Sequence, residues 1–238
     1  MMLGITAIAV GDSAIKVNFA GKVSYELNAA IQMYSKKLEE ASIPGVVEWV
    51  PAFNSVTVYY QPKQVSFHIL IKKLYDLHEV PISSEKIKSR IIQVPVLYGG
   101  EYAPDLQRVA EHSQLEINEV IDIHQNQEYL IYMIGFLPGF PYLAGLDKRI
   151  ATPRLEEPRG KIYAGAVGIA NEQTGIYPVE SPGGWNIIGK TPLRLFDRTE
   201  FLFQTGDYVK FHRVNKDKFL ELESQIKNNR FKVSIVER

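Results

Sequence analysis

The first third of the chain alternates between short apolar segments and segments in which apolar residues have a helical spacing. Apolar segments at 5–10 and 14–19 flank a Gly-Asp-Ser turn, which predicts two strands. From Ser24 onward, apolar side chains recur every three or four residues and therefore share one face of a helix. A Pro-Gly pair at 44–45 ends this helical region.

Two more strands and a second helix follow in the same part of the chain. Segments 46–53 and 55–60 predict a β-hairpin, and the apolar spacing over 67–77 predicts an amphipathic helix. This order of elements predicts a small α/β sandwich, which we assign to a domain at 1–85. The polar, mixed-charge segment 81–90 is predicted to be a linker.

The rest of the chain predicts mostly short strands, in a second domain at 90–238. Strands are expected at 91–97, 129–134, 164–170, 191–196, 201–203, 208–212 and 231–236. Helices are expected at 104–112, 117–124 and 216–227, with Ser113 and Asn118 as candidate cap residues. Short strands joined by Gly/Pro-rich loops are typical of a β-sandwich or a β-barrel.

Composition and charge exclude several classes of protein. The 238 residues are 45% hydrophobic, and 27 basic residues balance 27 acidic ones, so a general nucleic-acid binder is not expected. The absence of cysteine excludes disulfides and thiolate chemistry and fits a cytoplasmic protein. The apolar start lacks a basic region and reaches Asp12 early, which predicts a first strand and not a signal peptide. No apolar run approaches the ~18 residues of a membrane span, so no membrane association is expected.

The segment 135–191 is dense in glycine and proline, with aromatic residues and arginines between them. This composition excludes long helices and favours a rigid surface that presents fixed side chains. Arg154 and Arg159 each follow a proline, and a stiff backbone lowers the entropy lost when a guanidinium binds a carboxylate or phosphate. We predict that both arginines clamp a small anion. The alternative is a weak surface pairing with Glu156 and Glu157.

The aromatic residues of this segment are candidate walls of the same site, or else structural packing residues. The candidates are Phe136, Phe140, Tyr142, Tyr177 and Trp185. Gly183 and Gly184 would let a ligand approach the backbone closely. Asn186 offers both a donor and an acceptor, which suits recognition of an amide.

One pattern matches a phosphate-binding loop, although its context argues against that interpretation. Residues 184–191 satisfy G-x-x-x-x-G-K-[ST], but turn residues precede them and an alternating strand pattern follows Pro192. We interpret the match as a coincidence. In a weaker alternative, Lys190 and the backbone N–H groups around Gly183 and Gly184 hold an anion. The five histidines lack metal-ligand spacing, so no metal site is predicted.

Four motifs in the central segment resemble the allophanate hydrolase subunit 1 family. They are GFLPGFPYLAGLD at 135–147, TPRLEEPR at 152–159, QTGIYP at 173–178 and SPGGWNIIGKTP at 181–192. Smaller matches, such as PDL at 104–106, extend the resemblance over nearly the whole chain. The resemblance implies an α+β fold, with a ferredoxin-like α/β N-terminal domain followed by a cyclophilin-like β-barrel C-terminal domain.

The same resemblance implies a function and partners. The family includes components of an ATP-dependent 5-oxoprolinase, which opens 5-oxo-L-proline to L-glutamate. Such a chain is expected to need homologues of the A and C components of that enzyme, and the C component resembles the allophanate hydrolase subunit 2 family. ATP, with or without Mg, would be bound by the complex.

From the charges that such a reaction must hold, we assign roles to the candidate residues. Arg154 and Arg159 would be catalytic anion clamps, and the aromatic residues, both glycines, Asn186 and Lys190 would contact the substrate. The alternative function implied is inhibition of a sensor histidine kinase, whose dimerisation domain the β-barrel would bind.

Three positions depart from the family pattern. Ala166 stands where a serine is usual, Ala103 where a glycine is usual, and Lys190 where an arginine is usual. The first change removes a hydroxyl, which puts a catalytic role for that position in doubt. The third change alone creates the match to the phosphate-binding loop.

Overall fold

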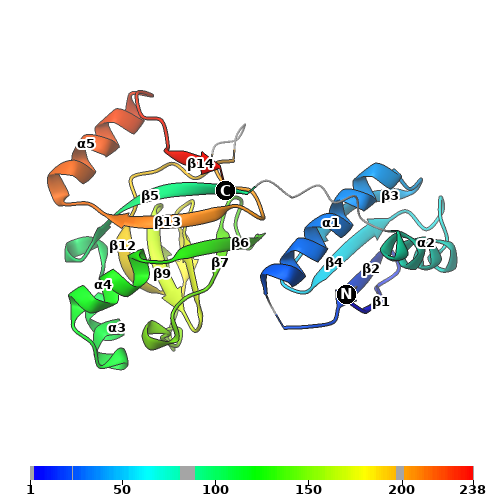
Figure 1. The fold of residues 1–238 in the computed structure, drawn as a ribbon, viewed down its shortest axis with the longest axis horizontal. Coiled ribbons are helices and arrows are strands. Elements are labelled where there is room, and N and C mark those ends of the chain that lie inside the picture. The colour runs from blue at the N-terminus through cyan, green and yellow to red at the C-terminus, as the bar shows by residue number, and fades with distance from the viewer. Residues whose placement is uncertain (1–2, 23, 81–88, 197–200, 238) are drawn as a thin grey trace. The chain divides into compact units, whose positions relative to one another are not determined.

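The computed structural model describes residues 3–22, 24–80, 89–196 and 201–237. It contains two compact units, residues 1–87 and 88–238, each with its own hydrophobic core (Figure 1). Most of the predicted linker at 81–90 lies outside the described residues.

The first unit is a four-stranded antiparallel sheet with two helices, and all the strands and helices predicted for it are present. The elements are β1 (Ile5–Val10), β2 (Ala14–Phe19), α1 (Tyr25–Ala41), β3 (Val46–Pro51), β4 (Ser55–Tyr60) and α2 (Phe67–Glu79). The strand order is β1-β2-β4-β3, so β4 lies between β2 and β3, the two strands that α1 connects. This is the split β-α-β arrangement of a ferredoxin-like sandwich, with an edge strand supplied by the start of the unit.

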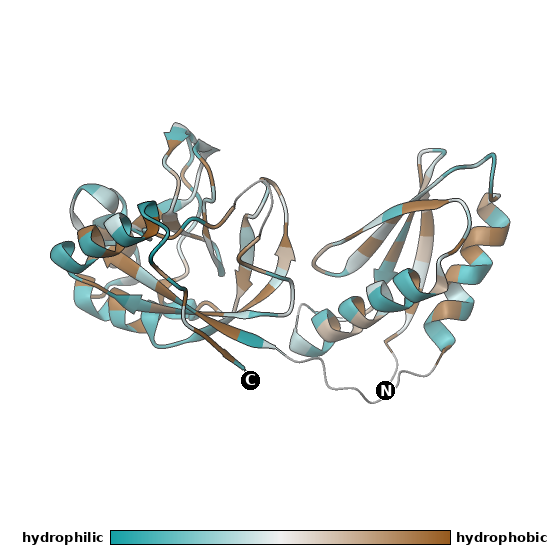
Figure 2. Ribbon diagram, turned by 90° about the horizontal axis from the view of Figure 1, so that it is seen from above, coloured by the Kyte–Doolittle hydropathy of each residue, from teal (hydrophilic) through white to brown (hydrophobic). Residues whose placement is uncertain are grey.

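Caps and apolar patterning explain why these helices form where they do. The Ser24 side chain accepts a hydrogen bond from Leu27 N at 3.2 Å, and Ser66 caps α2 in the same way. Ile15 and Val58 alternate with more exposed residues on the central strands and are fully buried in the core that the helices share with the sheet. Figure 2 shows the resulting alternation of apolar and polar residues along the helices. Among the described residues, no helix has the length and apolar character needed to cross a bilayer.

The second unit contains a closed β-barrel, in agreement with the expected fold. Its strands are β5 (Arg90–Tyr98), β6 (Glu128–Ile134), β7 (Pro141–Ala144), β9 (Ala166–Ala170), β10 (Gln173–Ile176), β12 (Asn186–Lys190) and β13 (Tyr208–Arg213). These seven strands follow the order β12-β9-β10-β7-β6-β13-β5, and pairing of β12 with β5 closes the barrel in the described part of the unit. The strand β14 (Ile235–Glu237) adds to β5, while β8 (Arg159–Ile162) and β11 (Ser181–Gly183) form a separate small sheet.

The described part of the second unit also contains three α-helices, at the segments where helices were expected. They are α3 (Leu106–Ser113), α4 (Ile117–Gln125) and α5 (Lys216–Lys227), with short 3₁₀ turns at Gly100–Tyr102 and Lys148–Ile150. The predicted caps Ser113 and Asn118 are wrong for the start of α4. Its N-cap is Glu116, which forms a reciprocal capping box with Glu119.

The strands within the Gly/Pro-rich segment differ most from the prediction. The expected strand at 164–170 is present as β9, but 191–196 is not a strand, and β12 precedes it. The segment expected at 201–203 contributes a single bridge, between Phe196 and Phe201. Strands β7, β8, β10 and β11 are three or four residues long. Segments this short show no clear alternation of apolar and polar residues. They are therefore defined by hydrogen-bond pairing with neighbouring strands and not by a local sequence pattern.

The barrel core contains a hydrogen-bonded histidine. His124 is fully buried, its Nδ1 lies 2.7 Å from the Tyr98 hydroxyl, and its Nε2 lies 2.9 Å from Thr174 Oγ1. The Thr174 hydroxyl donates its proton to Gly168 O, so it accepts from Nε2, and Nδ1 accepts from Tyr98. The network therefore assigns the neutral tautomer with the proton on Nε2. Burial lowers the pKa of His124 from 6.5 to about 3, which keeps the ring uncharged at neutral pH.

Candidate functional site

The five aromatic residues predicted as pocket walls form one cluster. The Phe140 ring centroid lies 4.9 Å from that of Tyr142, 5.1 Å from Tyr177 and 5.4 Å from Trp185. Phe140, Tyr177 and Trp185 are buried, Tyr142 is half-buried, and Phe136 is 65% exposed. The edge-to-face contacts make the three buried rings a rigid packed wall, and the outer members of the cluster are Tyr142 and Phe136.

The two predicted ligand-contact glycines have different surroundings. A Cβ on Gly183 would collide with the Tyr177 hydroxyl, so this glycine makes room for a protein side chain. A Cβ on Gly184 would lie 3.6 Å from Leu155 O and 3.7 Å from Arg154 Nη2, which is ordinary contact. Neither glycine has a positive φ, so the alternating left-handed backbone of an anion nest is not formed here.

Arg159 forms an internal ion pair. Its Nη1 and Nη2 donate to Asp105 Oδ2 and Oδ1 at 2.8 and 2.6 Å, and Asp105 Oδ2 also accepts from Ile187 N at 2.7 Å. The Asp105 side chain is 5% exposed and that of Arg159 is 35% exposed. The alternative pairing of Arg159 with Glu156 or Glu157 is wrong. An anion-clamp role for Arg159 stays a prediction, and the bidentate bond to Asp105 that occupies both of its Nη atoms argues against it.

Arg154 is the exposed guanidinium of the predicted pair. No described carboxylate forms an ion pair with it. Burial raises the pKa of Tyr142, and the nearby charge of Arg154 opposes that rise. Burial also raises the pKa of Tyr177 to about 12, against a hydrogen bond from the Trp185 backbone and the charge of Arg154. Arg154 Nη2 lies 3.7 Å from where a Cβ on Gly184 would be, and Gly184 directly precedes Trp185 of the aromatic wall.

Asn186 has a positioning role in place of the predicted substrate contact. It is fully buried, and its Nδ2 donates to Pro153 O at 2.9 Å and to Ile169 O at 3.1 Å. Its Oδ1 accepts from Arg108 Nε at 3.1 Å. Both donor protons are used, so the amide has none left for a ligand. Instead, this one side chain holds the residue before Arg154 and the guanidinium of Arg108.

Lys190 lies at the opposite end of β12 from the aromatic wall and is not brought together with Arg154. Its Nζ lies 4.5 Å from the Tyr102 ring centroid, 5.5 Å from that of Phe219, and 3.7 Å from Glu223 Oε1. These contacts fix the amino group by cation–π and ionic interactions. Because Lys190 ends a strand and no helix begins there, the phosphate-loop match is a coincidence, as predicted.

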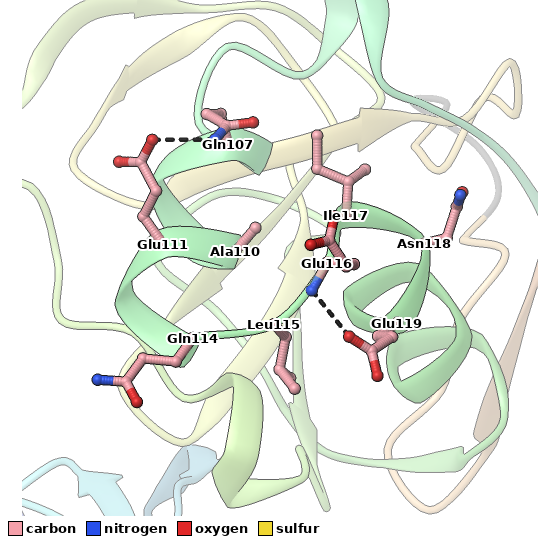
Figure 3. Close-up of a pocket in the computed structure, with 9 residues that line it drawn as sticks. All are labelled: Gln107, Ala110, Glu111, Gln114, Leu115, Glu116, Ile117, Asn118 and Glu119. Carbon is pink, nitrogen blue, oxygen red and sulfur yellow. Dashed lines mark hydrogen bonds between the residues drawn. The ribbon is translucent and has the colours of Figure 1, made fainter.

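Two concave surfaces in the described residues have linings that include none of these side chains. One has a volume of about 360 Å³, lies along α3 and α4, and is lined by carboxylate and amide residues including Gln107, Glu111 and Glu119 (Figure 3). The side chains of Glu111 and Glu119 already accept bonds from Gln107 and from the Glu116 backbone. The other, of about 480 Å³, lies in the first unit beside Tyr34. Neither contains a predicted site residue.

Comparison with known families gives a match over residues 5–202 to the carboxyltransferase domain, subdomain C and D. The chain belongs to this family. The match begins in β1 and extends past the aromatic and arginine residues, so both units and the candidate site are part of it.

Among relatives, the B component of 5-oxoprolinase from Bacillus subtilis is 44% identical over 220 residues, covering 87% of this chain and 92% of the relative. A conserved uncharacterized protein from Pyrococcus horikoshii has a solved structure that is 43% identical, with a TM-score of 0.53, covering 90% of this chain and all of the other. The Kluyveromyces lactis urea amidolyase, 20% identical with a TM-score of 0.85, covers the whole chain and supports the fold. This chain spans only 16% of that enzyme, and 40% of another solved chain that is 34% identical with a TM-score of 0.73.

In this member of the carboxyltransferase family, the candidate site is a packed aromatic wall flanked by guanidinium groups. Such an arrangement can bind a small anion, because arginine matches carboxylate and phosphate geometry. Sequence reasoning missed Arg108, which has no local signal, and Asp105, whose PDL motif was noted without a role. Their partners lie 78 and 54 residues away in the chain.

Proposed function

We propose that this chain is the B component of an ATP-dependent 5-oxoprolinase, which opens 5-oxo-L-proline to L-glutamate together with homologues of the A and C components. The observation that carries the proposal is the 44% identity to the B component of 5-oxoprolinase from Bacillus subtilis over nearly the full length of both chains. Identity on this scale, aligned over both units, favours a shared role over a shared fold alone.

The chemistry of the reaction fits the groups at the candidate site. A lactam resists water because amide resonance stabilises its carbonyl. Transfer of the γ-phosphoryl group of ATP to the carbonyl oxygen, with release of ADP, would make the carbon electrophilic. Water would then add to that carbon, and cleavage of the ring C–N bond would give the free amino group and an acyl phosphate. A second water would release phosphate and leave the carboxylate of L-glutamate. The substrate carboxylate and the transferred phosphoryl group are both anionic, and guanidinium groups stabilise both. Arg154, exposed and without a carboxylate partner among the described residues, is the group best placed for this task.

The remaining catalytic groups are assigned to the partner chains. Asp105, the buried carboxylate of this region, is held by Arg159 and by Ile187 N, so it is not available as a base. The nucleotide, with or without Mg, is expected to bind in the assembled complex. This chain would then contribute anion-binding and wall residues to a shared site.

Reconstitution tests the proposal. The chain is purified with homologues of the A and C components, and ATP turnover and glutamate formation are measured with 5-oxo-L-proline. Activity that needs all three chains, and that falls at least tenfold with Arg154→Ala, is expected. Arg213→Ala, which removes an exposed guanidinium bonded to the Asn118 amide, is the matched control and should retain activity. A full mixture without substrate-dependent turnover contradicts the proposal.

The alternative role, inhibition of a sensor histidine kinase, stays a prediction, as does a cytoplasmic location. A pull-down with kinase dimerisation domains would test the first of these. No contact or charge pattern of the described residues favours it over the enzyme role.

A further inference from the structure

We propose that Arg108 and Arg154 together form an anion-binding site beside residues 184–186, and that it takes a small carboxylate or phosphate. The identity of the anion as the 5-oxoproline carboxylate or a transferred phosphoryl group rests on the proposed function. The site itself rests on how the two guanidinium groups are held.

A single buried side chain bonds to Arg108 and to the residue before Arg154. Asn186 Nδ2 holds Pro153 O, directly before Arg154, and Asn186 Oδ1 accepts from Arg108 Nε. The Arg154 Nη2 lies 3.7 Å from the Cβ position of Gly184, two residues before Asn186. Two residues span at most about 7 Å, so both guanidinium groups adjoin the same short stretch of backbone.

The Nη groups of both arginines are available to a ligand. The hydrogen bond from Arg108 to Asn186 uses only its Nε, and Arg108 is exposed on α3. Among the described residues, neither Arg108 nor Arg154 forms an ion pair with a carboxylate. An arginine held through Nε keeps its planar fork oriented, which lowers the entropy lost on binding an anion.

The neighbouring buried carboxylate is already paired within the protein. Asp105 is the buried carboxylate of this region, and the bidentate bond to Arg159 neutralises it. This assignment replaces the predicted Arg154–Arg159 clamp with an Arg154–Arg108 clamp, in which Arg159 compensates the charge of Asp105. Burial raises the pKa of Tyr177, whereas a hydrogen bond from the Trp185 backbone and the charge of Arg154 oppose that rise.

A binding experiment on the full chain tests the site without requiring turnover. Backbone N–H signals of Gly184 and Trp185 are followed by NMR at constant ionic strength during titration with 5-oxo-L-proline or inorganic phosphate. The neutral lactam 2-pyrrolidinone, which lacks the carboxylate, is the ligand control. We expect saturable shifts with at least one anion and none with 2-pyrrolidinone.

Variants decide which residues bind. Arg108→Gln and Arg154→Gln are each expected to weaken binding about tenfold or more, because each removes a charge-assisted hydrogen-bonding group. Arg108→Lys keeps the charge without the fork and should recover part of the affinity. Arg213→Gln, an exposed arginine bonded to an amide oxygen in the same unit, should bind as the unsubstituted chain does.

The outcomes separate this inference from the proposed function. Absence of saturable binding by either anion, or unchanged binding in both Arg108→Gln and Arg154→Gln, overturns the site. Binding of phosphate but not of 5-oxoproline supports the site and assigns it to the phosphoryl group. An active reconstituted complex in which Arg108→Gln changes neither kcat nor KM supports the function and contradicts the site. Anion binding without turnover in the full mixture supports the site and contradicts the function.

Discussion

We expect acid to destabilise the barrel through protonation of the buried His124 ring. The ring is fully buried, makes hydrogen bonds suited to its neutral form, and has a pKa lowered from 6.5 to about 3. Between these two values the unfolded chain binds a proton at this position and the folded chain does not. Stability from this group is therefore complete above about pH 6.5 and is lost as the pH falls toward about 3.

The magnitude follows from the width of that window. Each pH unit below the pKa of the histidine in the unfolded chain lowers the free energy of unfolding by about 1.4 kcal/mol. At pH 4.5, His124 should therefore lower the stability of the barrel by about 3 kcal/mol relative to pH 7.5. Other titrating groups also change the pH dependence of stability, including His212, whose pKa is lowered by desolvation. The comparison must therefore be made between proteins that differ only at residue 124.

The assay is urea unfolding at pH 7.5 and pH 4.5, followed by the fluorescence of Trp185 in a Trp49→Phe background, so that the signal reports the second unit. His124→Gln removes the group that titrates. Between pH 7.5 and pH 4.5, the free energy of unfolding of this variant should therefore fall by about 3 kcal/mol less than that of the parent protein. His112→Gln removes an exposed histidine of the same unit and is the matched control. Equal pH dependence in the parent and in His124→Gln would refute the reasoning. If the variant does not fold, NMR of the parent protein decides, because a His124 ring that becomes protonated near pH 6 refutes it equally.

Three substitutions test other contacts, each by thermal unfolding of the second unit. Arg159→Ala leaves buried Asp105 without its counter-charge and should destabilise the unit by about 3 kcal/mol. Arg154→Ala, the control, should change stability little. Similar effects from both substitutions would contradict a structural ion pair at Arg159. Lys190→Met removes the cation from its aromatic surroundings and should cost about 1 kcal/mol, with Lys190→Arg nearer to the parent protein. Gly183→Ala should cost about 2 kcal/mol by collision with the Tyr177 hydroxyl, and Tyr177→Phe should relieve part of that cost in the double variant. Absence of any relief would show that the collision is not the cause.

Local signals in the amino-acid sequence were enough to predict the helices and strands that each bury one repeated face. Helices α1, α2 and α5 were predictable from apolar spacing and strands β1 to β4 from short apolar segments between turns. The motifs of segment 135–192 likewise indicated the family and, through it, the two folds. The lack of a helix after Lys190 was foreseeable from Pro192 and the residues that follow it.

Pairings between residues far apart in the chain became visible only in the folded protein. The short strands of the Gly/Pro-rich segment, including β10 and β12, form because neighbouring strands supply their hydrogen bonds. Their sequences show no alternation of apolar and polar residues that would predict them. The partners of Arg159 and Asn186 lie 54 and 78 residues away, so adjacent sequence pointed to the wrong carboxylates and to a ligand contact for a buried amide. The charge and shape of a side chain are given by its residue type. Which side chains remain available to a ligand depends on how closure of the barrel brings distant segments together.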